Sequence, residues 1–157
     1  MTDTTKTTSQ AERELVAFRI GKQEFAVDIT SVREIRGWTP ETVLPHTPSY
    51  VRGVINLRGT VLPILDLATR LGLPPADPTA RHVIILVQVG AQTLGLLVDA
   101  VSDILSAGED SVRPTPEIGG DAARQFVRGV LAVDGRMITL VALEEVLPSN
   151  VRMPVVA

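Results

Sequence analysis

The side chains of this sequence that could bind a metal are few and scattered. The chain has two histidines, His46 and His82, and no cysteine. A metal site needs clustered ligands, whereas these histidines stand in unrelated segments beside proline-rich stretches. Exposed or hydrogen-bonded histidines are therefore the favoured interpretation. The lack of cysteine also excludes a disulfide framework and a thiolate metal site. We expect no metal and no cofactor.

Three aspartates could suggest catalytic carboxylates. Asp28, Asp66 and Asp99 each stand where a strand is expected to give way to a turn or helix. Carboxylates at such positions commonly accept hydrogen bonds from backbone N–H groups, so capping is the favoured role. The sequence has no Gly-x-Ser-x-Gly, P-loop or dinucleotide-binding motif. These observations predict a protein that is not an enzyme.

Composition limits the remaining classes of function. The chain has 157 residues, of which 45% are hydrophobic and 3% aromatic, and its net charge is −3. A nucleic-acid-binding pair of small barrels is the alternative of a different class, but acidity and few aromatics argue against nucleic acid as a partner. The polar start lacks a signal-peptide core, and no apolar run reaches the ~18 residues of a membrane helix. We expect a cytoplasmic protein without direct membrane insertion.

An internal repeat organises the chain. Residues 50–59 match residues 126–135 at an offset of 76, with Val-Arg-Gly-Val and a later glycine at the same spacing. A second match relates residues 18–35 to residues 87–104 at an offset of 69. The same two halves therefore occur twice in the same order. Such a repeat predicts two similar units related by pseudo-twofold symmetry.

Each unit is expected to contain short strands and one short helix. Strands are predicted at residues 15–20, 24–27, 83–87 and 94–98, and short helices at residues 66–71 and 143–147. Two further hairpins turn at Arg58-Gly59 and Asp134-Gly135, because glycine accepts positive φ without a Cβ clash. Strands of this length and spacing favour small barrels. We expect barrels at about 15–72 and 80–147, or barrels with segments exchanged, between tails at 1–14 and 148–157.

The two downstream hairpins differ at their tips. The first carries Asn56 and Arg58, where the second carries Ala132 and Asp134. Asp is a good turn residue, whereas Arg has no special turn preference. A solvated arginine and an interface anchor both stay open for Arg58. For the lone aromatics Trp38 and Tyr50, packing over a barrel end is favoured over partner contact.

Several segments resemble a known family. These are Val-Arg-Glu-Ile-Arg-Gly at 32–37, the run from 47 to 59 with Pro-Ile-Leu-Asp-Leu at 63–67, and residues 95–104 with 112–117. They resemble the signatures of the CheW family of chemotaxis coupling proteins, over about residues 15–147. No kinase, phosphotransfer or receiver segment is attached. The chain is therefore more similar to the stand-alone coupling protein than to the CheW-like domain of a kinase.

The resemblance implies a fold and a function. The fold is all-β, with two pseudo-symmetric five-stranded SH3-like barrels and short helices. The function is that of a non-catalytic scaffold without cofactors, recruited to membrane-attached receptor arrays. Its partners are the regulatory domain of the histidine kinase CheA and the cytoplasmic tip of methyl-accepting chemoreceptors. The alternative is an adaptor of the same type in a surface-motility or developmental receptor–kinase pathway, which the residues do not separate.

The resemblance also implies two sets of contact residues. The receptor-binding positions are Val32, Glu34, Ile35, Gly53, Asn56, Arg58 and Gly59. The kinase or ring-interface positions are Arg113, Pro116, Glu117 and Ile118. An aromatic residue is usual in the family where Ile118 stands.

Overall fold

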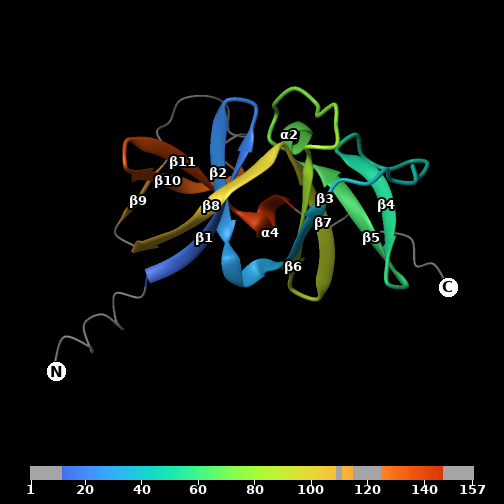
Figure 1. The fold of residues 1–157 in the computed structure, drawn as a ribbon, viewed down its shortest axis with the longest axis horizontal. Coiled ribbons are helices and arrows are strands. Elements are labelled where there is room, and N and C mark those ends of the chain that lie inside the picture. Colours follow the sequence, from blue (N-terminus) through green and yellow to red (C-terminus); the bar gives the residue numbers. More distant parts are fainter. Residues whose placement is uncertain (1–11, 109–110, 115–124, 147–157) are drawn as a thin grey trace.

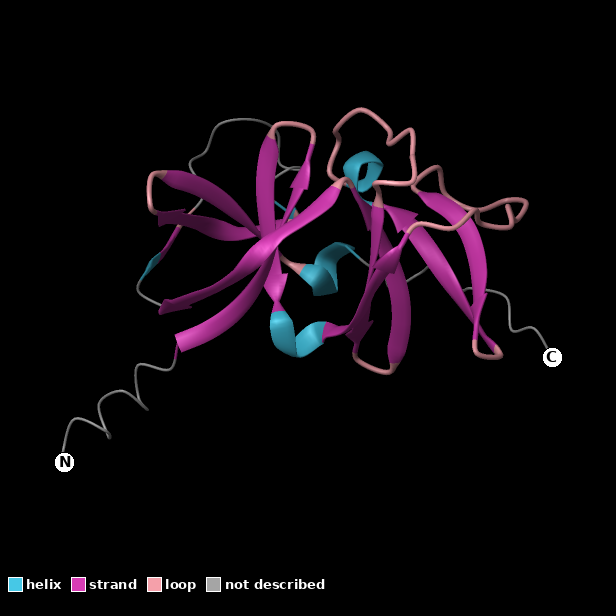
Figure 2. Ribbon diagram, viewed as in Figure 1, coloured by secondary structure: helices cyan, strands magenta, loops and turns pink. Residues whose placement is uncertain are grey.

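The computed structural model describes residues 12–108, 111–114 and 125–146, and these form two curved sheets with short helical turns (Figures 1 and 2). Sheet A contains β1 (Glu12–Ile20), β2 (Gln23–Asp28), β8 (Ala100–Gly108), β9 (Val112–Arg113), β10 (Val127–Val133) and β11 (Arg136–Val141). Sheet B contains β3 (Val32–Gly37), β4 (Val51–Leu57), β5 (Thr60–Asp66), β6 (Val83–Val89) and β7 (Gln92–Val98). The helical turns are η1 (Ile29–Ser31), α2 (Leu67–Arg70) and α4 (Leu143–Val146).

The two sheets have the same strand order. Sheet A runs β8-β1-β2-β11-β10-β9 and sheet B runs β3-β6-β7-β5-β4, so strands that are equivalent in the repeat hold equivalent places. Each sheet has one parallel pair, β2 with β11 and β5 with β7. The expected all-β fold with two pseudo-symmetric barrels is confirmed. Sheet A has one strand beyond the expected five, the two-residue β9.

The sheets do not follow the order of the two sequence units. Sheet B is built from the continuous stretch 32–98, whereas sheet A combines residues 12–28 with residues 100–141. Neither residues 15–72 nor residues 80–147 complete a sheet alone. The physical reason is the parallel β2–β11 pair, which joins the first hairpin of the chain to its last one.

Glycines form equivalent bulges in the two downstream hairpins. The register of β4 on β5 shifts between Val51 and Gly53, and that of β10 on β11 shifts at the equivalent Gly129. A Cβ on Gly53 would lie 2.2 Å from the carbonyl oxygen of Thr42, and its φ of +148° also disfavours other residues. A Cβ on Gly129 would lie 2.6 Å from the carbonyl oxygen of Arg113. Both glycines are therefore required by a close approach between backbones.

The main hydrophobic core lies between the two sheets. Phe18 and Phe25 of sheet A stack with ring centroids 5.9 Å apart, and they share one buried cluster with Ile85 and Leu96 of sheet B. Each sheet also has a smaller cluster of its own. Burial of a large aliphatic side chain stabilises by about 1.5–3 kcal/mol, so this shared cluster holds the barrels together. The expected packing role of the lone aromatics is confirmed, since Trp38 and Tyr50 pack against core clusters.

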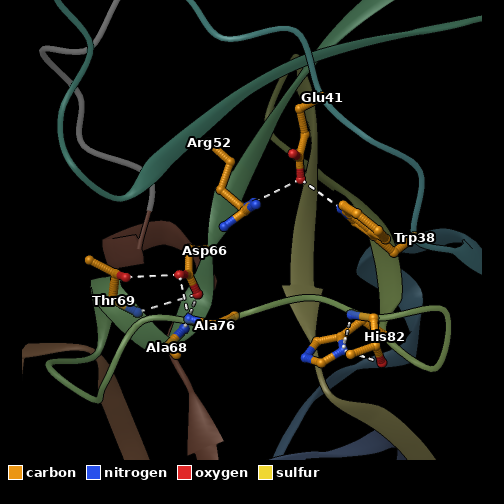
Figure 3. A network of polar contacts seen from close by, with 9 residues as sticks. Trp38, Glu41, Arg52, Asp66, Ala68, Thr69, Ala76 and His82 are labelled. Carbon is orange, nitrogen blue, oxygen red and sulfur yellow. Dashed lines mark hydrogen bonds and ion pairs between the residues drawn. The ribbon is translucent and has the colours of Figure 1, made fainter.

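The three conspicuous aspartates all accept backbone hydrogen bonds. Asp66 is buried and caps α2, accepting from Ala68 N at 3.1 Å, and it also holds the following linker by accepting from Ala76 N at 2.9 Å (Figure 3). Asp28 accepts from the backbone N–H of residue 30 at 2.9 Å, and Asp99 from that of residue 21 at 2.8 Å. The predicted backbone role of these carboxylates is confirmed.

Candidate functional site

The tip of the β4–β5 hairpin presents Arg58 to solvent. Arg58 and Gly59 both have positive φ, 51° and 86°, as a type I′ turn requires. The side chain of Asn56 shapes this turn, because its Oδ1 accepts a hydrogen bond from Gly59 N at 2.9 Å. The Arg58 side chain is 71% exposed. Its expected accessibility is confirmed.

Arg58 reaches across to β3. Its Nη2 lies 2.8 Å from Oε1 of Glu34, whose Oε2 lies 3.4 Å from Nη1 of Arg36. The hydrogen bond from Arg58, together with the charges of both arginines, holds the pKa of Glu34 below its ordinary value against the opposing effect of desolvation. Glu34 is therefore ionised at neutral pH. Because β3 and β4 are the two edges of sheet B, this ion pair bridges the open side of the barrel.

Exposed apolar side chains occur on the same elements. Ile35 of β3 is 42% exposed and Val61 of β5 is 37% exposed. Val61 pairs with Asn56 across the hairpin. An arginine beside exposed apolar groups is a common composition of protein-binding surfaces. Val61 therefore lies on the same hairpin as Arg58, whereas Ile35 and Glu34 are successive residues that point to opposite faces of β3.

The structure brings only part of the sequence-predicted receptor set together. Glu34, Arg58, Asn56 and Gly59 form one connected polar group, with Ile35 next to Glu34 in the chain. Gly53 is buried at the bulge, and Val32 packs against the main core. Those two residues shape the backbone and the core beneath the surface. Their part in partner binding stays a prediction.

The second predicted set lies on the other barrel. Arg113 is exposed on β9 of sheet A, opposite Val130 of β10. Pro116, Glu117 and Ile118 lie outside the described residues. Arg58 and Arg113 therefore belong to different barrels, as separate contact faces for two partners would require.

One polar network escaped the sequence analysis. Glu41, whose side chain is 5% exposed, accepts hydrogen bonds from Arg52 Nε at 2.8 Å and from Trp38 Nε1 at 3.0 Å (Figure 3). The network fastens the segment after β3 onto β4. Its only sequence signal is a charged pair eleven residues apart, a spacing that fits no single helix or strand.

One of the two histidines pairs with an aspartate, and the other is exposed. His82 lines a cleft of about 440 Å³ together with Asp99. Its Nδ1 accepts from Thr79 N at 3.0 Å, and its Nε2 lies 3.3 Å from Asp99 Oδ1. His46 is exposed, so the expectation of exposed or hydrogen-bonded histidines is confirmed. In the described part of the chain, no three metal-ligating side chains cluster and no helix is long and apolar enough to cross a membrane.

The chain is similar in sequence and in fold to known proteins of one family. Residues 14–151 match the family model of the CheW-like domain. The chain is 66% identical to the probable chemotaxis protein CheW of Rhizobium etli, over 88% of this chain and 90% of that protein. It is 59% identical to the chemotaxis protein CheW of Rhizobium meliloti, over 97% and 98%. The crystal structure of the scaffolding protein TtCheW from Thermoanaerobacter tengcongensis is 32% identical, with a TM-score of 0.79 over 89% of this chain and 90% of that chain.

Two barrels joined by a shared core, together with these matches, define the chain as an adaptor or scaffold protein. This chain belongs to the CheW family, the scaffold proteins of chemotaxis. Protein FrzA of Myxococcus xanthus is 32% identical over 81% of this chain, below the two rhizobial chemotaxis relatives. The higher identity to relatives named for chemotaxis means that the surface-motility or developmental alternative is not favoured.

Proposed function

We propose that this chain is a non-catalytic scaffold that couples methyl-accepting chemoreceptors to the histidine kinase CheA. It would act in the cytoplasm, at membrane-attached receptor arrays. The observation that supports this most directly is the exposed Arg58 at a tip shaped by Asn56, where the equivalent tip carries Asp134. The turn needs no cation, and the ion pair with Glu34 leaves the Arg58 side chain largely exposed, so we assign this arginine to a partner contact.

The receptor contact would combine charge with apolar area. The planar guanidinium of Arg58 can donate to carbonyl or carboxylate oxygens on the helical tip of a receptor. Val61, which pairs with Asn56 across the hairpin, would bury apolar surface in the same contact, and Ile35 would add apolar surface on the outer face of β3. Glu34 would hold β3 and the hairpin tip together while the contact forms.

The kinase contact would use other faces, with Arg113 of sheet A among them. A scaffold that binds receptor and kinase at different faces links kinase activity to receptor conformation, through a coupling free energy between the faces. Assembly into a lattice raises the effective concentration of each partner, so individually weak contacts suffice.

The test of the receptor face is Arg58→Ala. Loss of a central interface arginine commonly costs ~2 kcal/mol or more, so receptor binding should weaken about thirtyfold. Arg58→Glu should be worse because it adds repulsion toward acidic receptor groups. A receptor fragment and the regulatory domain of CheA would be titrated separately against parent and variants, with thermal melts alongside. Binding of the kinase domain should persist.

Asp134→Ala is the matched control, because Asp134 holds the same position in the other hairpin at nearly the same φ. It should leave receptor affinity unchanged. If Arg58→Ala binds receptor like the parent, the β4–β5 tip is not the receptor site. If Arg58→Ala fails to fold, Arg58 has a structural role instead.

The second face is tested with Arg113→Ala. This variant should weaken array growth more than direct receptor binding, because the family resemblance places Arg113 at a barrel-to-barrel contact. Arg113 is exposed, so the unfolding free energy should change by no more than about 0.5 kcal/mol. Equal losses of receptor binding and of array order would refute the assignment of this face.

A further inference from the structure

Arg70 lies where the two barrels meet. It is the last residue of α2, next to sheet B, and its guanidinium carbon lies 4.3 Å from the centre of the Tyr50 ring and 4.5 Å from the centre of the Phe126 ring. Tyr50 directly precedes β4 of sheet B, and Phe126 directly precedes β10 of sheet A. One cation is therefore held between two aromatic rings, one from each barrel.

Arg70 also donates hydrogen bonds to α4. Its Nε lies 2.8 Å from the carbonyl oxygen of Val146, and its Nη2 lies 3.4 Å from that of Glu145. Carbonyls at the end of a helix have no partner within the helix, so they need an outside donor. α4 follows β11 of sheet A and lies between the two sheets in Figure 1. The side chain thus bonds across the boundary between the barrels.

The internal repeat makes this contact unusual. Tyr50 and Phe126 are equivalent residues at the offset of 76, and so are Arg70 and Val146. Arg70 contacts both equivalent rings and the backbone of its own counterpart. By pseudo-symmetry, a residue at position 70 and one at position 146 could each lie between the two rings. Only position 70 carries an arginine, because its counterpart is Val146.

The shared core does not by itself fix how the barrels are oriented. Hydrophobic attraction is itself non-directional, so a defined orientation also depends on side-chain shape and on polar contacts across the boundary. A guanidinium has its donors in a rigid plane and stacks on aromatic faces, which satisfies Arg70 in one geometry only. Arg70 is thus a directional contact between the barrels, beside the chain crossing at Asp99, which accepts from Gly21 N at 2.8 Å and lies 3.3 Å from Nε2 of His82.

We infer that Arg70 is a positioning residue that fixes the relative orientation of the two barrels. The inference concerns the geometry of the chain alone and does not depend on the proposed function. Under that function it has a further consequence. Arg58 and Arg113 lie on different barrels, so Arg70 would also set the angle between the receptor face and the kinase face.

The test measures the distance between the barrels. The chain has no cysteine, so Ala91→Cys in the β6–β7 turn and Ala132→Cys on β10 accept spin labels at two defined exposed positions. Arg70→Met keeps much of the apolar length of the side chain but removes the charge and the planar set of N–H donors. It should broaden or shift the distance distribution between the labels and lower the Tm by roughly 4–8 °C. Arg70→Lys should broaden the distribution too, because lysine lacks the planar fork.

Arg52→Met is the matched control. Arg52 is also a partly buried arginine, but its partner, the carboxylate of Glu41, belongs to the same barrel. This variant should lower the Tm and leave the distance distribution unchanged. An Arg70→Met distribution as narrow as that of the parent would overturn the inference and leave Arg70 an ordinary stabilising residue. If Arg70→Met does not fold, Tyr50→Leu, which removes one ring and keeps both hydrogen bonds, decides by the same measurement.

Discussion

The two hairpin tips have similar backbone conformations, but the arginines at or next to them make different contacts. Arg58 of the β4–β5 tip and Asp134 of the β10–β11 tip have φ of 51° and 49°. Next to the second tip, Arg136 bonds Glu24 through Nη2 at 2.6 Å and Nε at 3.0 Å, and it bonds Asp103 at 3.2 Å. Arg136 therefore ties three strands of sheet A together, whereas Arg58 contacts one carboxylate.

This difference shows how a repeat can separate stability from binding. The Arg136 side chain is 31% exposed and has two carboxylate partners, while that of Arg58 is 71% exposed. Hydrogen bonds to Glu24 and Asp103 hold the pKa of Arg136 above its ordinary value. An arginine fixed in this way serves the barrel. An arginine with one partner and free surface is available to another protein.

The largest expected effect comes from the glycines beneath the two tips. Gly53→Val should destabilise by roughly 3 kcal/mol or more, because it combines a clash with the Thr42 carbonyl and a strained backbone. It should impair receptor binding as well, through misfolding. Gly129→Ala should cost less, since its Cβ meets the Arg113 carbonyl oxygen and Val112 Cγ1 but no positive φ adds backbone strain. Urea unfolding compares the two variants, and a larger cost at Gly129 would contradict the assigned cause.

The second prediction concerns the arginines themselves. Arg136→Ala should lower the Tm by roughly 2–6 °C, because it leaves Glu24 and Asp103 without their cation. Arg58→Ala should change the unfolding free energy by no more than about 0.5 kcal/mol, as an exposed ion pair contributes little. Thermal melts of both variants under one condition test this. Equal losses would mean that both tips serve the fold alike.

The third prediction is a dependence on acid. Arg136 lowers the pKa of Glu24, and Arg58 lowers that of Glu34, below the ordinary value of 4.5. A lowered carboxyl pKa stabilises the fold fully above the unfolded value and loses that effect as pH falls through the folded value. The Tm should therefore decrease as the pH is lowered below about 4.5. Melts at several pH values should show a flatter fall in Arg136→Ala and in Arg58→Ala.

The smallest effect is expected from Arg58→Asn. Asn-Gly suits a type I′ turn, and asparagine tolerates positive φ better than arginine. This gain should offset the lost ion pair with Glu34, leaving the unfolding free energy within about 0.5 kcal/mol of the parent value. Receptor binding should still drop as in Arg58→Ala. A variant that melts normally and binds normally would remove Arg58 from the receptor site.

Much of the fold could be predicted because the repeat is visible in the residues. The match between residues 50–59 and 126–135 located both downstream hairpins, and the short helices predicted at 66–71 and 143–147 coincide with α2 and α4. The assignment of strands to sheets could not be predicted with the same certainty. Local patterns identify a strand but do not say which distant strand it pairs with, and β2 pairs with β11.

The candidate site was only partly visible for the same reason. Arg58 and Asn56 stand out because their counterparts differ in the second copy of the repeat. The pairing of Arg58 with Glu34 spans 24 residues, and that of Arg70 with Val146 spans 76. Such contacts depend on tertiary folding, which residue types and spacing do not encode locally.

In the sequence, the residues of sheet B lie between the two segments that form sheet A, and this order has a consequence for folding. Sheet B comes from one continuous stretch, 32–98, so it can form as soon as that stretch has left the ribosome. Sheet A must wait, because Glu24 and its partner Arg136 are 112 residues apart. Closing so long a loop is slow, and it becomes less costly once sheet B has brought the two ends together. The barrel that carries Arg58 should thus act as the template on which the other one closes.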